Sequence, residues 1–160
     1  MLKKVLFGLT LIISFAGCLK NSGGTSTCSY DPCSIKAPQS EIDSVKKYLA
    51  SKNISAAIQH CSGLFYQIVD SGTGRKPVVC NNVNVSYVGK LTNDTTFDQR
   101  TITLSLSQVI TGWENGIPLI REGGRILLYI PPSLGYGGYS NGPVPANSIL
   151  IFDVKLNAVQ

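Results

Sequence analysis

The stretch Val109-Ile110-Thr111-Gly112-Trp113 holds the only tryptophan of this 160-residue chain and follows an alternating apolar pattern. Glu114 comes three residues after Thr111, the spacing of a capping box in which the two side chains bind free amides at a helix start. We therefore expect a short helix from Thr111 to about Ile120, with Pro118 late in it. A tryptophan in the first turn of such a helix is placed to form the floor of a pocket.

Before this stretch, side chains alternate with a period of two at residues 64–69, 83–89 and 102–106, which predicts strands there. After it, we expect a strand at residues 125–130, stopped by Pro131-Pro132, and a long, largely apolar last strand at 149–159. Residues 40–49 carry apolar side chains at helical spacing instead, and predict a packing helix with Ser40 and Asp43 at its capped start. About five antiparallel strands with one short embedded helix predict an α+β fold.

Residues 1–17 have the pattern of a targeting segment. Two lysines precede an apolar run from Val5 to Phe15, which is too short to span a bilayer, and Ala16-Gly17-Cys18 follows. This pattern resembles a bacterial lipoprotein signal, with cleavage before Cys18 and acylation of its sulfur. Ordinary secretory cleavage nearby is the alternative. On the lipoprotein interpretation we expect a lipid-anchored protein of the bacterial cell envelope that faces the periplasm.

Four further cysteines remain after Cys18, at positions 28, 33, 61 and 80. An even number in an exported chain favours disulfides, and four cysteines allow three connectivities, between which the sequence does not choose. Zinc is the rival interpretation, but these spacings do not match paired zinc knuckles, and His60 is the single histidine available as a further ligand. We therefore predict disulfides, no metal, no cofactor and no role for His60.

The chain divides into four parts on these patterns. We predict a signal peptide at residues 1–17, a tether with cysteines at 18–39, a helical extension at 40–62 and the main domain at 63–160. The net charge of +5 comes from residues scattered along the chain, so we expect no nucleic-acid partner.

Five motifs within residues 64–159 resemble, in order and approximate spacing, those of the FKBP-type peptidyl-prolyl isomerases. They are Val85-Ser86-Tyr87-Val88-Gly89, Leu91 with Phe97-Asp98, Val109-Ile110-Thr111-Gly112-Trp113, Tyr136-Gly137, and Ile149-Leu150-Ile151-Phe152-Asp153-Val154. Each motif alone is a weak signal, but the ordered set is specific.

The resemblance implies a half-open antiparallel sheet wrapped around the short helix, with an apolar pocket between them and Trp113 as its floor. By the same resemblance, one group of residues is catalytic and another contacts substrate. The catalytic group is Tyr87, Phe97, Asp98, Trp113, Tyr136 and Phe152. The substrate-contact group is Ile102, Val109, Ile110 and Val144.

The activity that the resemblance implies is rotation of X-Pro bonds to assist the folding of exported proteins. A pocket of this kind needs no nucleophile, because the bond only has to twist. The Ile110 N–H and the Tyr136 hydroxyl would hold substrate carbonyls, and Asp98 would orient polar groups. The expected partners are proline-containing polypeptides, macrolide ligands and a membrane reached through the lipid anchor. The alternative is an FKBP-like binding or chaperone module with little isomerase activity.

One segment departs from the family pattern. Between Asp98 and Leu104 the family usually has a longer loop, often with an arginine that pairs with the aspartate, and here Arg100 is available for that pairing. Ile102 and Leu104 stand where aromatic side chains are common. These departures bear on substrate range and catalytic strength rather than on fold.

Overall fold

The structure, a computed structural model, describes residues 28–160, so the predicted signal segment and Cys18 lie outside the described residues. The strands are β1 (Ile58–Gln59), β2 (Phe65–Asp70), β3 (Asn82–Lys90), β4 (Thr96–Ser105), β5 (Arg125–Ile130) and β6 (Leu150–Val159). They form one antiparallel sheet in the order β1-β2-β5-β6-β3-β4. The predicted α+β class is confirmed. β1 is a sixth strand, and its two residues are too few to show a period in the sequence.

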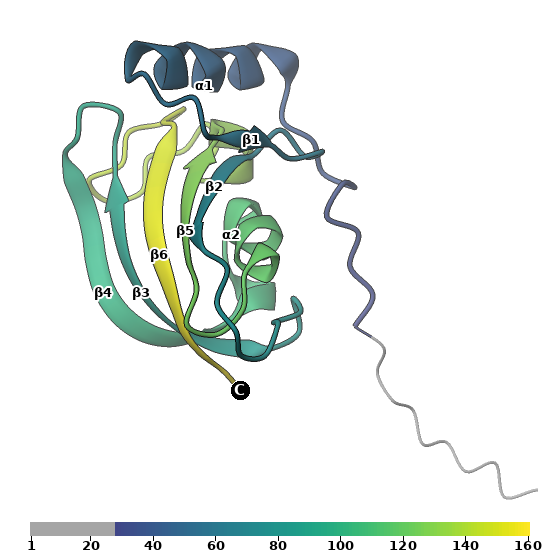
Figure 1. Ribbon diagram of the computed structural model, residues 1–160. Coiled ribbons are helices and arrows are strands. Elements are labelled where there is room, and N and C mark those ends of the chain that lie inside the picture. Colours follow the sequence, from purple (N-terminus) through teal and green to yellow (C-terminus); the bar gives the residue numbers. More distant parts are fainter. Residues whose placement is uncertain (1–27) are drawn as a thin grey trace, which may run out of the picture.

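The sheet curves around a short helix, α2 (Thr111–Gly116), and a longer helix, α1 (Gln39–Ser51), lies across one end of it (Figure 1). α1 turns Ile42, Val45 and Leu49 into the core, and these residues are all buried. Three short 3-10 turns complete the described elements. They are η1 (Leu106–Gln108), η2 (Ile117–Leu119) and η3 (Pro132–Leu134).

Both predicted capping boxes are wrong. The N-cap residues are Pro38 for α1 and Ile110 for α2, and neither helix start has a side-chain cap. The predicted length of the short helix is wrong as well, because α2 ends at Gly116 and continues only as η2. Pro118 explains this end, since it lacks the N–H that an α-helix would donate to the carbonyl four residues earlier.

Two glycines set the distance between α2 and the sheet. A Cβ on Gly112 would lie 2.6 Å from Ile130, and a Cβ on Gly116 would lie 2.5 Å from Leu128, both on β5. Separations this short are excluded for real side chains, so only glycine lets the helix backbone lie directly on β5. This contact fixes the depth at which Trp113 is held.

Two disulfides tie an extended N-terminal segment, residues 28–37, to the body of the protein. Cys28 pairs with Cys80, and Cys33 pairs with Cys61. The disulfides that the sequence favoured are therefore present, and the structure supplies the connectivity that the sequence left open. We call residues 28–37 the strap. Across residues 28–160 there is no cluster of three side chains suited to a metal ion, and none of the helices is long and apolar enough to cross a membrane.

Candidate active site

The register of β3 with its two neighbours gathers the predicted pocket residues on the concave face of the sheet. Tyr87 pairs with Arg100 of β4, and Gly89 pairs with Asp98 of β4 and with Phe152 of β6. Paired positions place their side chains on the same face, and that face alternates along each strand. Tyr87, Asp98 and Phe152 therefore all face α2.

A cavity of about 560 Å³ lies between this face and α2. We call it the aromatic cavity. Eight of the residues that the sequence singled out line it, and four further residues complete the lining. The eight are Tyr87, Asp98, Ile102, Val109, Ile110, Trp113, Tyr136 and Phe152, and the other four are Leu104, Gln108, Thr111 and Gly135.

Trp113 lies at the centre of a cluster of perpendicular aromatic rings. Its ring centroid is 4.9 Å from that of Tyr87 and 5.2 Å from that of Phe152, both in edge-to-face arrangements. Only 4% of Trp113 is exposed, so the indole is held rigidly by its neighbours. Its Nε1 atom is buried and has no hydrogen-bond partner within residues 28–160. The tryptophan, which lines the cavity, thus offers a bound ligand a rigid, flat apolar surface.

Asp98 is held from two sides at the edge of the cavity. The Tyr87 hydroxyl donates to its Oδ2 atom, and Arg100 donates to its Oδ1 atom from Nε at 3.0 Å and from Nη2 at 2.9 Å. The pairing of Arg100 with Asp98 that the sequence offered is therefore present. The segment from Asp98 to Leu104, where the family usually has a longer loop, is part of β4. Asp98 and Arg100 are two residues apart in this strand, so their side chains lie on the same face.

The charge states of this group follow from its contacts. Burial, together with the hydrogen bond to Asp98, raises the pKa of Tyr87 to about 12. Burial alone would raise the pKa of Asp98, but the hydrogen bonds from Tyr87 and Arg100 outweigh it and hold that pKa below its ordinary value. At neutral pH the phenol is therefore neutral and the carboxylate is charged. Asp98 is suited to fixing the position of Tyr87, not to transferring a proton.

Two predicted site residues do not line the cavity. Phe97 packs against Phe152 with 5.5 Å between ring centroids, and Val144 is a buried residue within the loop between η3 and β6, where it forms a β-bridge with Asn141. Gly89 makes room for the two phenylalanines, because a Cβ there would lie 2.7 Å from Phe97 and 2.8 Å from Phe152. Phe97 therefore supports the wall of the cavity from outside it.

Ile110 and Tyr136 both line the cavity and are only partly buried, and we call this part of the cavity its mouth. Ile110 is extended, and its carbonyl accepts from the amides of Trp113 at 2.8 Å and Glu114 at 3.2 Å. Its own amide N–H makes no hydrogen bond within residues 28–160, so it is available to a ligand carbonyl. Tyr136 follows η3, which Glu41 of α1 anchors by accepting from the Ser133 amide and hydroxyl at 2.9 and 2.8 Å.

Four lining residues were absent from the predicted site. Thr111 lies in the motif with Trp113, but its spacing to Glu114 indicated a helix cap rather than a cavity residue. Leu104 was noted only as an aliphatic replacement on the cavity wall. Gln108 and Gly135 carry no sequence signal, because they reach the cavity through the η1 turn and the end of η3.

Comparison with known proteins gives one family. Residues 73–157 match the family model described as FKBP-type peptidyl-prolyl cis-trans isomerase. The chain is 37% identical over 134 residues to the isomerase FkpA of Aeromonas hydrophila, and the aligned region covers 78% of this chain and 50% of the relative. It is 43% identical over 118 residues to FkpA of Buchnera aphidicola, covering 70% of this chain and 46% of the relative. The chain thus spans about half the length of these curated relatives.

Solved structures agree with this match. The crystal structure of FkpA from Escherichia coli superposes with a TM-score of 0.68 at 34% identity, covering 76% of this chain and 60% of that one. The crystal structure of a peptidyl-prolyl isomerase from Pseudomonas syringae gives a TM-score of 0.67 at 27% identity, covering 78% of this chain and 98% of that one.

Proposed function

This chain belongs to the FKBP-type peptidyl-prolyl cis-trans isomerase family, and from that membership we propose that it catalyses rotation of X-Pro bonds in polypeptides. The observation that carries the proposal is the aromatic cavity. Its floor is Trp113, and Tyr87 and Phe152 meet that floor edge-on. With its proline ring on the indole face, a substrate would have the preceding peptide bond near the mouth of the cavity.

The cavity suits this reaction for an electrostatic reason. Resonance in the amide sets a barrier of roughly 18–20 kcal/mol, and the planar bond is more charge-separated than the twisted one. Surroundings of aromatic rings solvate the planar ground state poorly, which lowers the relative energy of the twisted transition state. Each 1.4 kcal/mol or so removed from the barrier accelerates rotation about tenfold.

The polar groups at the mouth have separate tasks in this proposal. The Ile110 N–H donates to a substrate carbonyl, and the Tyr136 hydroxyl donates to another. Asp98, bound by Arg100, keeps the Tyr87 ring upright against the indole. These residues orient the substrate, and none of them exchanges a proton with it.

The setting of the activity is part of the proposal. We propose that the protein is exported, is anchored through a lipid on Cys18 in the bacterial envelope, and assists the folding of proline-containing proteins in the periplasm. The lysine-led apolar segment that ends at Cys18 supports export. The two disulfides support an oxidising compartment. Macrolide ligands of the family are proposed to occupy the same aromatic cavity.

The test is a proline-limited peptide isomerisation assay on the wild type and two variants. Trp113→Leu removes the cavity floor and is expected to lower kcat/KM about 100-fold, a loss of ~2.7 kcal/mol of transition-state stabilisation. Tyr66→Leu on β2 is the control, since it replaces a partly buried aromatic ring that packs on the core outside the cavity. Wild-type activity at the uncatalysed background would refute the proposal, as would unchanged activity in folded Trp113→Leu.

One observation favours a second candidate function, a binding or chaperone module with little isomerase activity. Ile102 and Leu104 make one wall of the cavity aliphatic rather than aromatic. If the protein suppresses aggregation of an unfolded client without accelerating proline-limited refolding, this second function is correct. Acceleration that disappears in Trp113→Leu supports the isomerase instead.

A further inference from the structure

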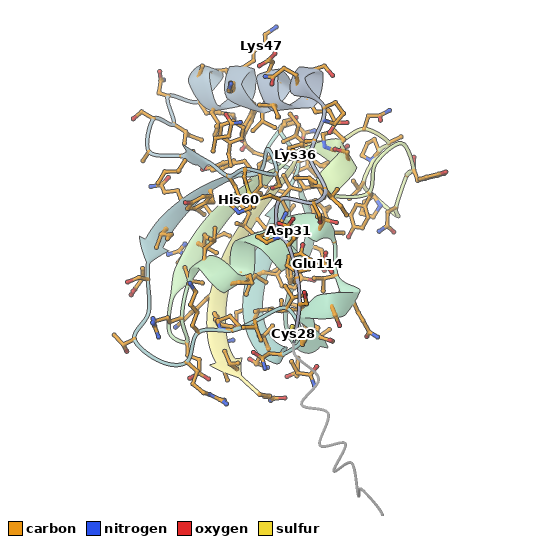
Figure 2. All side chains as sticks on the ribbon, turned by 90° about the vertical axis from the view of Figure 1, so that its right-hand side faces the viewer. Cys28, Asp31, Lys36, Lys47, His60 and Glu114 are labelled. Carbon is orange, nitrogen blue, oxygen red and sulfur yellow. A yellow bond between two sulfur atoms is a disulfide. The ribbon has the colours of Figure 1, made fainter. Side chains whose placement is uncertain are left out.

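A second cavity, of about 420 Å³, lies on the other side of α2. The strap forms one wall through Tyr30 and Pro32, and the segment between β2 and β3 forms another through Val78. Asn115 of α2 lines the cavity from the helix side. In Figure 1 the strap runs beside α2, on its right, and in Figure 2, which faces that side of the molecule, it passes in front of α2. We call this space the strap cavity.

The strap cavity is held open by covalent links rather than by a sheet. The Cys28–Cys80 disulfide joins the strap to the segment between β2 and β3, and Cys33–Cys61 joins it to the turn after β1. The Tyr30 hydroxyl then ties the strap to α2, donating to Asn115 Oδ1 at 2.7 Å. A ligand would therefore meet a preformed site and would bear little of the ordering cost.

Asn115 leaves one polar group unsatisfied in this site. Only 3% of the residue is exposed, and its Nδ2 atom has no hydrogen-bond partner within residues 28–160. A buried donor without an acceptor costs about 1–3 kcal/mol, so an acceptor brought by a ligand would recover that energy. The oxygen of the same amide accepts from Tyr30, which leaves Nδ2 as the unpaired polar atom of a residue that lines the cavity.

Glu114 places an acceptor beside this donor. Its Oε2 atom lies 3.4 Å from the same Tyr30 hydroxyl that binds Asn115, and within residues 28–160 its carboxylate forms no ion pair. Burial and the neighbouring Glu114 raise the pKa of Tyr30 to about 12, so the phenol stays neutral and remains a donor at physiological pH. One phenol thus contacts both the Asn115 amide and the Glu114 carboxylate, and the carboxylate keeps lone pairs that can accept from a ligand N–H.

The rest of the lining is mainly apolar, and it is open to solvent at Val78, which is 50% exposed. Pro32, Pro77, Pro118 and Leu119 supply further apolar surface, while Lys76 opposes the charge of Glu114. A phosphate-bearing ligand would meet the carboxylate, and a metal ion would meet the amide N–H. A neutral peptide group, with one C=O and one N–H, matches the donor and the acceptor together.

We propose that the strap cavity is a second polypeptide-binding site, which takes a short, neutral, apolar segment of an unfolded chain. The segment's carbonyl accepts from Asn115 Nδ2, its N–H donates to Glu114, and its side chains pack against Val78 and the prolines. Proline in the segment is not required. The site does not depend on the proposed isomerase activity, because it lies on the opposite side of α2 from the Trp113 floor.

The test is a titration of the full-length, ¹⁵N-labelled chain with the blocked tripeptide acetyl-Val-Ala-Leu-amide, followed by NMR. The side-chain amide of Asn115 reports on the strap cavity, and the indole N–H of Trp113 reports on the aromatic cavity. We expect the Asn115 resonances to shift and saturate. Val78→Asp should weaken the peptide at least tenfold, because it places a charge in the apolar lining at an exposed position that folding tolerates. Val69→Asp, equally exposed on β2 but outside the cavity, is the matched control and should leave affinity within twofold.

Two results would overturn the proposal. One is an Asn115 amide that does not move at 10 mM peptide, whether or not the Trp113 indole moves. The other is an equal loss of affinity in Val69→Asp and Val78→Asp, which would show that the peptide does not use the strap cavity. Neither result bears on isomerisation, since the peptide contains no proline and no turnover is measured.

Discussion

The two sides of α2 differ in how each cavity is built. On the Trp113 side, the register of β3, β4 and β6 places the side chains, and the polar groups of Tyr87, Asp98 and Arg100 bind one another. On the Asn115 side, two disulfides hold the strap in place, and the Asn115 amide donor has no acceptor among residues 28–160. One helix thus separates a cavity made by sheet geometry from one made by covalent links. The two should therefore respond to different perturbations.

Removal of the disulfides should give the largest difference between the two sides. The bridges close chain separations of 52 and 28 residues, and the chain-entropy model assigns each a stabilisation of about 4 kcal/mol. Replacing both cysteines of Cys28–Cys80 by serine should therefore lower the free energy of unfolding by about 4 kcal/mol in urea denaturation. Below the new melting temperature, kcat/KM should stay within about twofold. A loss of activity equal to that of Trp113→Leu would show that the strap supports the aromatic cavity.

Moving the helix itself should affect both sides. In Gly116→Ala the added methyl group would lie 2.5 Å from Leu128, so α2 must shift away from β5. Overpacking of this kind costs about 1–3 kcal/mol of stability, and the displaced Trp113 should lower kcat/KM as well. Gly138→Ala is the control, because a Cβ there meets nothing closer than 3.9 Å. Equal behaviour of the two variants in thermal unfolding and in the peptide assay would contradict the close-packing account of α2.

A smaller change should weaken only the Trp113 side. Asp98→Asn keeps the shape of the side chain but removes the charge that binds Arg100 and Tyr87, and we expect kcat/KM to fall about tenfold, or ~1.4 kcal/mol. Asp153→Asn is the matched control, since Asp153 forms a similar pair with Arg125 on the convex face. Both substitutions should cost about 1 kcal/mol of stability or less, because the pairs are partly exposed. An equal fall of kcat/KM in both variants would contradict the proposal that Asp98 acts by holding Tyr87 in the aromatic cavity.

The smallest effect expected is that of pH, and on the Trp113 side its sign differs between Asp98 and Tyr87. The lowered pKa of Asp98 contributes stability above its unfolded value of 3.8, which is lost only as pH falls through the lower folded pKa. The raised pKa of Tyr87 contributes stability below 10.0, which is lost as pH rises through about 12. Between pH 6 and 9 neither group titrates, so kcat/KM should vary by less than about twofold.

His60 lines the strap cavity and should respond within the acidic range. Burial lowers its pKa from 6.5, so it contributes stability above pH 6.5 that is lost as pH falls through the folded pKa. The melting temperature should therefore decrease slightly on acidification below pH 6.5, and His60→Gln should remove that decrease. If kcat/KM of the wild type shows the same pH dependence as the melting temperature, protonation of His60 in the strap cavity also affects catalysis in the aromatic cavity.

The fold and most of the aromatic cavity were predictable because they rest on local patterns and on ordered motifs. Tyr87 and Phe152 lie in strands whose period of two is visible in the sequence, and Trp113 lies in the motif that opens α2. Phe97 was assigned to the cavity on its motif, yet it packs one ring further out, because side-chain packing and not strand period decides which ring is innermost. Gln108 and Gly135 escaped prediction because turns bring them to the cavity without any periodic signal.

The α+β class, the family and the cavity floor could be predicted from the amino-acid sequence, because strand period, helix spacing and five ordered motifs are properties of the chain read in one dimension. The four cysteines after Cys18 also allowed disulfides to be predicted, but not their pairing. The folded structure was needed to show which cysteines pair, that Arg100 holds Asp98, and that Asn115 lines a second cavity with an amide N–H that has no acceptor among residues 28–160. Each of these depends on distances between segments far apart in the chain, and such distances are set by packing rather than by local pattern.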